Sequence, residues 1–348
     1  MKKHGTLKKV IVTLCIILLL LLLAGYMAFR IYFGGTKTQH QDYQQGKTMT
    51  MEQAAKEEKA GDTSVSTVYY TDDISSDGML KIYDALGVDL KGKVGVKLSF
   101  GEKGDTYYLD PQLIKPLVQK VNGTFIECNT AYGGSRTSTA EHLQVAKDHG
   151  FADVAKIDIM DANGTMKIPV KGGSHLKTDE VGKDLANYDS ILVLSHFKGH
   201  TMGGFGGAIK NISIGIASKE GKSLIHSGGK RTKGILGDQN DFLESMAEAA
   251  SAVSDYEGDN IVYISVMNNL SVDCDCDSSP AKPTMKDIGI FASTDPLALD
   301  QACVDQVYDA PDGADLINRI ESRNGLLTLK HAAEMGLGNR AYRLVSID

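Results

Sequence analysis

Near the N-terminus the chain has a run of twenty residues, Val10 to Phe29, without a charged side chain. An α-helix rises about 1.5 Å per residue, so this run matches the ~30 Å hydrocarbon core of a lipid bilayer. It is too long and too uniformly apolar for an ordinary helix buried in a domain core. We therefore expect residues 10–33 to form a transmembrane anchor.

The charges on either side of this run indicate its orientation. Four lysines lie within residues 1–9, and only Arg30 follows closely. Because cytoplasmic flanks are rich in Lys and Arg, we expect a cytoplasmic basic tail and an extracytoplasmic main domain, in a single-pass protein of the cell membrane. The alternative is a cleaved signal peptide, but residues 23–28 fit a small-x-small cleavage site poorly. A lipoprotein would need a cysteine where Tyr26 stands.

Residues 34–64 are rich in Gln, Lys, Thr, Glu and Gly and contain almost no large apolar side chains. Such a segment cannot bury enough surface to offset the entropy lost on ordering. The sequence therefore predicts a disordered, solvated stalk that separates the membrane from a domain over residues 65–348.

The net charge of the chain is unevenly distributed. The whole chain carries −7, the first 33 residues contribute +5, and the remainder therefore carries −12. An acidic domain has no electrostatic reason to bind a phosphate polymer. We expect no nucleic-acid partner.

Short apolar runs alternate with helical patterns throughout the main domain. Several of the runs are apolar on consecutive residues, as in strands buried on both faces. The expected strands are Val94–Phe100, Thr124–Cys128, Ala155–Met160, Ser190–Ser195, Ile261–Met267 and Ile288–Ala292. The expected helices are Asp110–Val121, a helix from Thr137 that ends at Gly150, Asp241–Val253, Pro296–Tyr308 and Gly313–Met335. This alternation predicts an α/β domain with a mostly parallel sheet and helices on both faces.

A glycine-rich segment with histidines and a lysine follows the strand at residues 190–195. Its glycines are paired and would let the backbone approach a ligand, so we predict that they bind a cofactor. Imidazoles can move protons or bind a metal, and a lysine can attract an anion or act as a base or nucleophile. The candidate side chains of the segment are His196, His200, Lys210 and His226, and the predicted cofactor-binding glycines are Gly203, Gly204, Gly206 and Gly207. The alternative is a tight turn whose histidines bond to backbone carbonyls.

Two further clusters of polar residues also follow predicted strands. Ser135 and Arg136 precede a helix, where backbone N–H groups and a guanidinium suit an anion such as a phosphate or carboxylate. We therefore predict that these two residues also bind a cofactor. Cys274 and Cys276 alternate with aspartates, a pattern typical of a metal or redox site. We predict a divalent transition metal held by His200, His226 and the two cysteines as one candidate. The alternatives are an ordinary turn at the first cluster and, at the second, cysteines that have no role or pair with each other.

Several of these segments resemble the "domain of unknown function 362" family over about residues 65–345. They are the run His200 to Ile216, the Cys-x-Cys loop, and Asp287 to Pro296. Members of this family are often described as Fe–S-centre proteins, and many carry an inserted ferredoxin module. Residues 227–260, where that module is expected, contain no cysteine. We therefore expect no ferredoxin-type cluster here.

The glycine-rich segment is also distantly similar to the nickel-pincer lactate racemase family. That resemblance implies a cofactor-holding role for Lys210, with His200 and His226 at the positions of a metal ligand and a proton-transfer group. We therefore predict His200, Lys210 and His226 as catalytic residues. The family's Thr-Gly-x-His-Arg motif is replaced here by Gly134-Ser135-Arg136, so one histidine is missing.

Three functions remain open at this level. The first is a cofactor-binding protein or enzyme that binds an anionic small molecule at the Gly-rich site. The second is a non-catalytic module that binds a ligand or partner, and the third is a thiol or metal redox protein that uses Cys274 and Cys276.

Overall fold

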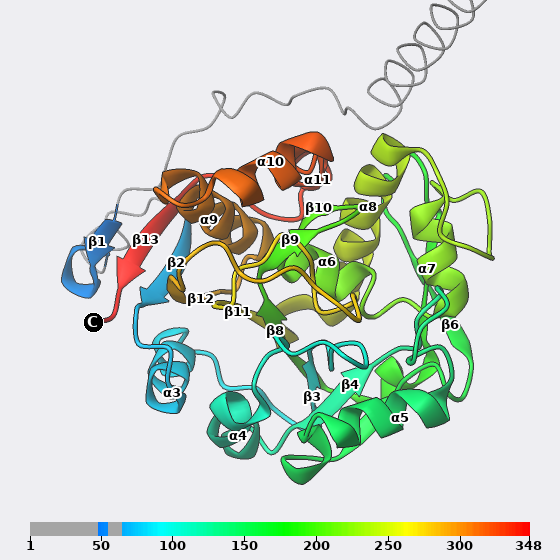
Figure 1. The fold of residues 1–348 in the computed structure, drawn as a ribbon, viewed down its shortest axis with the longest axis horizontal. Coiled ribbons are helices and arrows are strands. Elements are labelled where there is room, and N and C mark those ends of the chain that lie inside the picture. Colours follow the sequence, from blue (N-terminus) through cyan, green and yellow to red (C-terminus); the bar gives the residue numbers. More distant parts are fainter. Residues whose placement is uncertain (1–47, 55–64) are drawn as a thin grey trace, which may run out of the picture.

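A computed structural model describes residues 48–54 and 65–348. Within these residues, nine strands form one sheet (Figure 1). In spatial order they are β1 (Thr48–Thr50), β13 (Tyr342–Ser346), β2 (Ser66–Thr71), β12 (Gly289–Ser293), β11 (Ile261–Met267), β8 (Ser190–His196), β3 (Val94–Lys97), β4 (Thr124–Glu127) and β5 (Ile157–Ile159). Only β12 runs against its neighbours, and the other pairings are parallel. The prediction of a mostly parallel sheet is confirmed.

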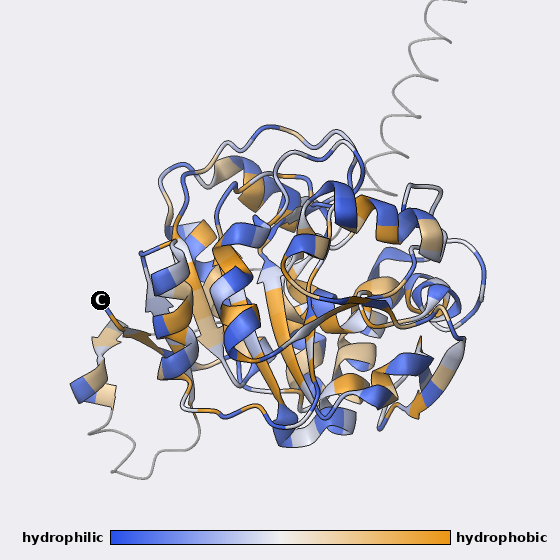
Figure 2. Cartoon of the chain, turned by 90° about the horizontal axis from the view of Figure 1, so that it is seen from below, coloured by the Kyte–Doolittle hydropathy of each residue, from blue (hydrophilic) through white to orange (hydrophobic). Residues whose placement is uncertain are grey.

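Helices cover both faces of the sheet, as predicted. One face carries α3 (Ser76–Ala85), α4 (Pro111–Lys120) and α5 (Thr139–Asp148). The other carries α6 (Ala208–Ser213), α7 (Lys219–His226), α8 (Gln239–Glu257), α9 (Pro296–Asp309), α10 (Ala314–Ser322) and α11 (Leu326–Glu334). Side chains along β8 alternate between the two cores: Ile191 and Val193 pack on the α8 side, and Leu192 and Leu194 on the α3 side. Figure 2 shows the apolar strands enclosed by helices with polar outer surfaces.

Helix boundaries follow the local capping signals. The side chain of Asp110 accepts a hydrogen bond from the backbone N–H of Gln112 at the start of α4. Ser138 caps α5, and Asp295 caps α9 with bonds to two backbone N–H groups. Such a cap satisfies donors that have no partner inside the helix. The predicted helix over 313–335 is two helices, because Asn324 adopts a left-handed backbone conformation with φ of 54°.

In the described part of the chain, the remaining elements are two small hairpins and three short 3-10 helices. One hairpin pairs β6 (Thr165–Pro169) with β7 (Thr178–Gly182), and the other pairs β9 (Lys198–His200) with β10 (Gly204–Gly206). The 3-10 helices span Phe151–Asp153, Lys183–Asn187 and Gly258–Asn260. The glycine-rich segment, to which the sequence assigned no helix or strand, forms the second hairpin followed at once by α6, which carries Lys210.

The predicted transmembrane anchor at 10–33 lies outside the described residues, and so do 34–47 and 55–64 of the predicted stalk. Thr48–Thr50 also belong to that predicted stalk, yet they form β1 in parallel with β13. Strand pairing uses backbone groups, so it does not require the apolar side chains that this segment lacks. In the part of the chain that is described, we find no helix with both the length and the apolar character needed to cross a membrane.

Candidate functional site

A cavity of about 640 Å³ opens at the carboxyl ends of β3 and β4. Lys97 and Glu127, the last residues of these strands, lie in its wall, and residues 130–136 form one side. Open α/β sheets place ligands at this edge because the loops that follow parallel strands converge there. The hairpin β9–β10 and helices α6 and α7 supply the opposite wall.

The structure brings the three predicted catalytic side chains to this one cavity. His200 comes from the end of β9, Lys210 from α6 and His226 from the end of α7, and all three line the cavity. Ser135, Arg136 and Cys276 line it as well.

The predicted cofactor-binding glycines lie elsewhere. Gly206 and Gly207 border a second cavity of about 80 Å³, which shares Lys210 and Cys276 with the first, whereas Gly203 and Gly204 border neither. At Gly204, where φ is 82°, a Cβ would lie 3.0 Å from the Cα of Gly325. At Gly207 a Cβ would lie 2.2 Å from Oδ1 of Asp300. Gly204 and Gly207 are therefore closely packed against neighbouring parts of the chain.

Asp300 fixes the start of the helix that carries Lys210. Its carboxylate accepts hydrogen bonds from the backbone N–H groups of Ala208 at 2.6 Å and Ile209 at 2.9 Å. These two N–H groups directly follow the Gly206-Gly207 pair, and the chain itself satisfies them. Burial raises the pKa of Asp300 to about 7, although the two N–H groups favour its charged form. Asp300 is not among the site residues predicted from the sequence.

The turn at Ser135 and Arg136 does bind a carboxylate, but the carboxylate belongs to Glu102 of the same chain. Glu102 accepts hydrogen bonds from the backbone N–H of Ser135 at 2.7 Å and from its hydroxyl group, and its second oxygen faces the Arg136 guanidinium at 3.5 Å. Burial alone would raise the pKa of Glu102, but the bonds from Ser135 and the charge of Arg136 outweigh burial and lower it. The predicted anion site is therefore already occupied by Glu102.

Glu127 joins two buried cations in the wall of the cavity. Its carboxylate lies 3.1 Å from the Lys97 ammonium and 3.3 Å from the Arg136 guanidinium. Asn211 also accepts a hydrogen bond from Lys97 at 2.8 Å. Sequence reasoning missed Lys97 and Glu127, although a charged residue at the end of an otherwise apolar strand is a usable signal.

Lys210 is a buried cation that has no counterion in this network. Among the described residues, its ammonium has no hydrogen-bond or ion-pair partner, and it faces both cavities. Burial, followed by repulsion from Lys97 and Arg136, lowers the pKa of Lys210 to about 8. The amine therefore carries a positive charge at neutral pH with no carboxylate beside it.

The two cavity histidines carry their proton on different ring nitrogens. Nδ1 of His200 accepts hydrogen bonds from the backbone N–H groups of Met202 at 3.2 Å and Gly203 at 2.7 Å, so the neutral ring carries its proton on Nε2. Nδ1 of His226 lies 2.6 Å from the carbonyl of Lys222 and donates to it, which leaves a lone pair on Nε2. Burial lowers the pKa of His226 to about 4 and that of His200 well below its usual value. Both rings are neutral near pH 7, one as a donor and the other as an acceptor.

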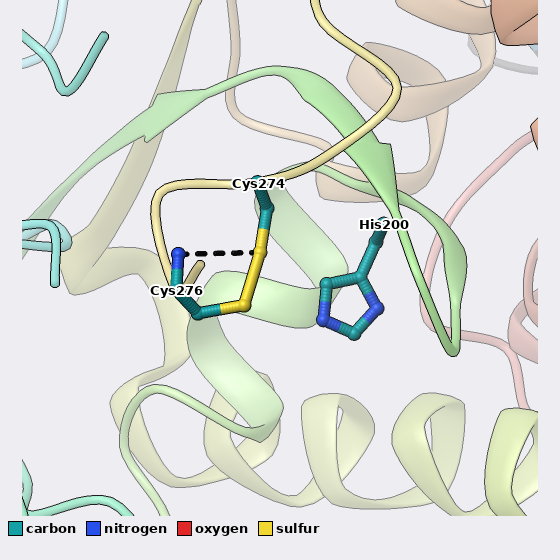
Figure 3. A group of neighbouring side chains, drawn as sticks. All are labelled: His200, Cys274 and Cys276. Atoms are coloured by element: carbon teal, nitrogen blue, oxygen red, sulfur yellow. Dashed lines mark hydrogen bonds between the residues drawn. A yellow bond between two sulfur atoms is a disulfide. The ribbon is translucent and has the colours of Figure 1, made fainter. Parts of the chain in front are cut away.

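The cysteine pair lies beside His200. Cys274 and Cys276 form a disulfide, and the His200 ring faces it (Figure 3). Of the four predicted metal ligands, the structure brings these three within 4.8 Å of one another and leaves out His226. Disulfide sulfurs are not thiolates, and Nε2 of His200 carries a proton, so this state offers a metal no strong ligand.

A family model described as "Domain of unknown function (DUF362)" matches residues 94–305, more than half of the chain. The chain belongs to this family. The DUF362 match runs from β3 into α9 and includes every residue that lines the cavity. No curated protein matches the chain.

Two solved structures are similar to this DUF362 chain at low identity. The lactate racemase apoprotein from Thermoanaerobacterium thermosaccharolyticum has a TM-score of 0.42 and 13% identity, with 71% of this chain and 58% of that chain covered. A structural-genomics protein from Thermotoga maritima has a TM-score of 0.40 and 13% identity, with 66% and 57% covered. The chain thus spans a little over half the length of either protein.

The adjacent glycines 206 and 207 allow a matched test of the packing of Asp300 against the start of α6, the helix that carries Lys210. A Cβ at Gly207 would collide with Asp300, whereas a Cβ at Gly206 would make an ordinary 3.5 Å contact with the Lys210 side chain. We expect Gly207→Ala to lower the free energy of unfolding by about 1–3 kcal/mol. Gly206→Ala should change it by no more than about 0.5 kcal/mol. Urea unfolding measures both, and equal effects would contradict the proposed packing.

Proposed function

We propose that the cavity binds a small anionic molecule and that Lys210 provides the opposing charge. The observation that carries this proposal is the Lys210 ammonium, which faces the cavity without a partner among the described residues. An ammonium removed from water without a counterion is costly, and a bound carboxylate or phosphate would supply one.

The charges around the cavity support this proposal. Glu127 and Glu102 already oppose Lys97 and Arg136. A second buried lysine, Lys222, donates only to backbone carbonyls, at 2.6 Å to Ala217 and 3.5 Å to Cys128. The lining is therefore left with an excess of positive charge, in a chain whose overall charge is −7. A volume of about 640 Å³ is in the usual range for a small organic ligand.

The opposite protonation of the two histidines supports proton transfer on the bound molecule. Nε2 of His226 is free to accept a proton, and Nε2 of His200 has a proton to donate. A neutral imidazole is an effective base or acid only when the correct nitrogen faces the substrate. This arrangement favours an enzyme that moves a proton on an anionic substrate. In a non-catalytic binding module the two rings would have no need to differ.

We also propose that the domain lies outside the cytoplasm, tethered to the membrane. The uncharged run at 10–29, preceded by four lysines, supports a membrane anchor with the domain outside the cytoplasm. The substrate would then be a molecule of that compartment. The negative charge of the domain gives it no electrostatic reason to bind a nucleic acid.

Replacing Lys210 tests the proposed anion site. We expect Lys210→Met to weaken the binding of the anion by about 10- to 100-fold, because a charge-assisted hydrogen bond contributes about 1.5–3 kcal/mol. The measurement is isothermal titration of the full chain in detergent with inorganic phosphate and a set of small carboxylates.

Lys219→Met is the matched control. Its ammonium bonds to the carbonyl of Thr137 and does not line the cavity, so this variant should bind like the parent. Unchanged affinity in Lys210→Met, with every probe that the parent protein binds, would refute the site.

The affinity for the anion should also depend on pH, because the Lys210 amine loses its charge at high pH. Because burial has lowered its pKa to about 8, the amine is charged below that pH and loses its charge above it. Anion affinity should be constant below about pH 7 and should fall by up to tenfold per pH unit above about pH 8. A Lys210→Arg variant that still binds should show no such decline up to about pH 9.5, since arginine stays protonated. A decline of the same size in both proteins would assign the titration to another group.

A further inference from the structure

We propose that Cys274 and Cys276 form a reversible two-electron redox pair that exchanges with small thiols entering the cavity. This inference goes beyond the proposed binding of an anion and does not depend on it. It rests on the position of the disulfide, the access to its two sulfurs, and the groups that would stabilise a released thiolate.

The disulfide contributes little to holding the fold together. A structural disulfide stabilises chiefly by restricting the unfolded chain, and this effect grows with the length of the loop it closes. This one closes over the single residue Asp275. The loop is already anchored without it, because the Asp275 carboxylate binds Lys198 at 2.6 Å and His196 at 3.0 Å.

The two sulfurs are accessible, in contrast to the other described cysteines. Cys276 lines the large cavity, and both Cys274 and Cys276 line the small one. Cys128 and Cys303 are only 1% and 0% exposed, and burial raises the pKa of both thiols. A buried, protonated thiol is inert, so these two residues serve as internal controls.

Polar groups are placed to stabilise a thiolate on Cys274. The backbone N–H of Cys276 donates a hydrogen bond to Sγ of Cys274 at 3.3 Å (Figure 3). The His200 ring is within 4.8 Å of both sulfurs, with its proton on Nε2, and the Lys210 ammonium borders the same small cavity. Donors and positive charge near sulfur favour the thiolate form.

These positions assign a direction to the exchange. A small-molecule thiolate that enters the large cavity attacks Sγ of Cys276 and forms a new S–S bond. The Cys274–Cys276 bond breaks, and Cys274 leaves as the thiolate. A second thiolate then attacks the outer sulfur of the mixed disulfide and releases Cys276 as a thiolate. The protein gains two electrons, and the two small thiols leave joined as one oxidised disulfide.

The first experiment follows the redox state of the full chain in detergent. The protein carries Cys15→Ser and is equilibrated in mixtures of reduced and oxidised dithiothreitol or glutathione, followed by alkylation and peptide mass mapping. We expect Cys274 and Cys276 to become labelled together and reversibly, while the helical circular dichroism and the unlabelled state of Cys128 and Cys303 do not change. A pair that stays oxidised, or that is reduced only when Cys128 and Cys303 also become labelled, would overturn the proposal.

Single substitutions test which sulfur is attacked. With oxidised glutathione, Cys274→Ser should form a mixed disulfide at Cys276 about tenfold faster than Cys276→Ser forms one at Cys274, because only Cys276 borders the large cavity. Equal rates would contradict attack at Cys276. Rates no higher than that of a denatured control peptide in both variants would overturn the redox role itself.

Discussion

The buried carboxylate of Glu127 stabilises two cations in the wall of the cavity. It lies against both Lys97 and Arg136, and all three side chains are almost fully buried. Removing one partner from a buried ion pair costs about 3–5 kcal/mol, since the other charge is left without compensation. Glu127 therefore allows the fold to keep two cations in the cavity wall. Their field, added to burial, is what lowers the pKa of Lys210 to about 8.

The general architecture could be predicted from the sequence because its signals are local. Buried strands such as Ile261–Met267 are continuous apolar runs, and caps such as Asp110 and Asp295 stand directly before their helices. Strand β1 could not be predicted in this way, because its residues carry no apolar pattern and it is held by backbone pairing with β13. The six residues of α6 were also missed, since the carboxylate that caps this helix comes from Asp300, 92 positions along the chain.

The candidate site shows the same division between local and tertiary information. Residue types selected the glycine-rich segment, and the resemblance to the lactate racemase family selected His200, Lys210 and His226 within it, which share one cavity. They could not reveal that Glu102 occupies the turn at Ser135, or that Asp300 takes the donors next to the glycine pairs. These contacts join segments that lie far apart in the sequence, so no short motif encodes them.

The anion site and the cysteine pair share Lys210 and His200, so the two functions we propose are physically linked. A thiolate on Cys274 or Cys276 would place negative charge near the ammonium that an anionic ligand also requires. Two negative charges that compete for one cation weaken each other, and by linkage the effect is reciprocal. A bound anion would accordingly favour the disulfide form.

The central claim is that two neutral histidines face the Lys210 cavity with opposite nitrogens protonated. Nitrogen-15 NMR of imidazole-labelled protein at neutral pH tests it most directly, with His200→Gln and His226→Gln used to assign the signals. The account predicts that His200 carries its proton on Nε2 and His226 on Nδ1. The same tautomer in both rings, or a doubly protonated ring in either, would contradict it.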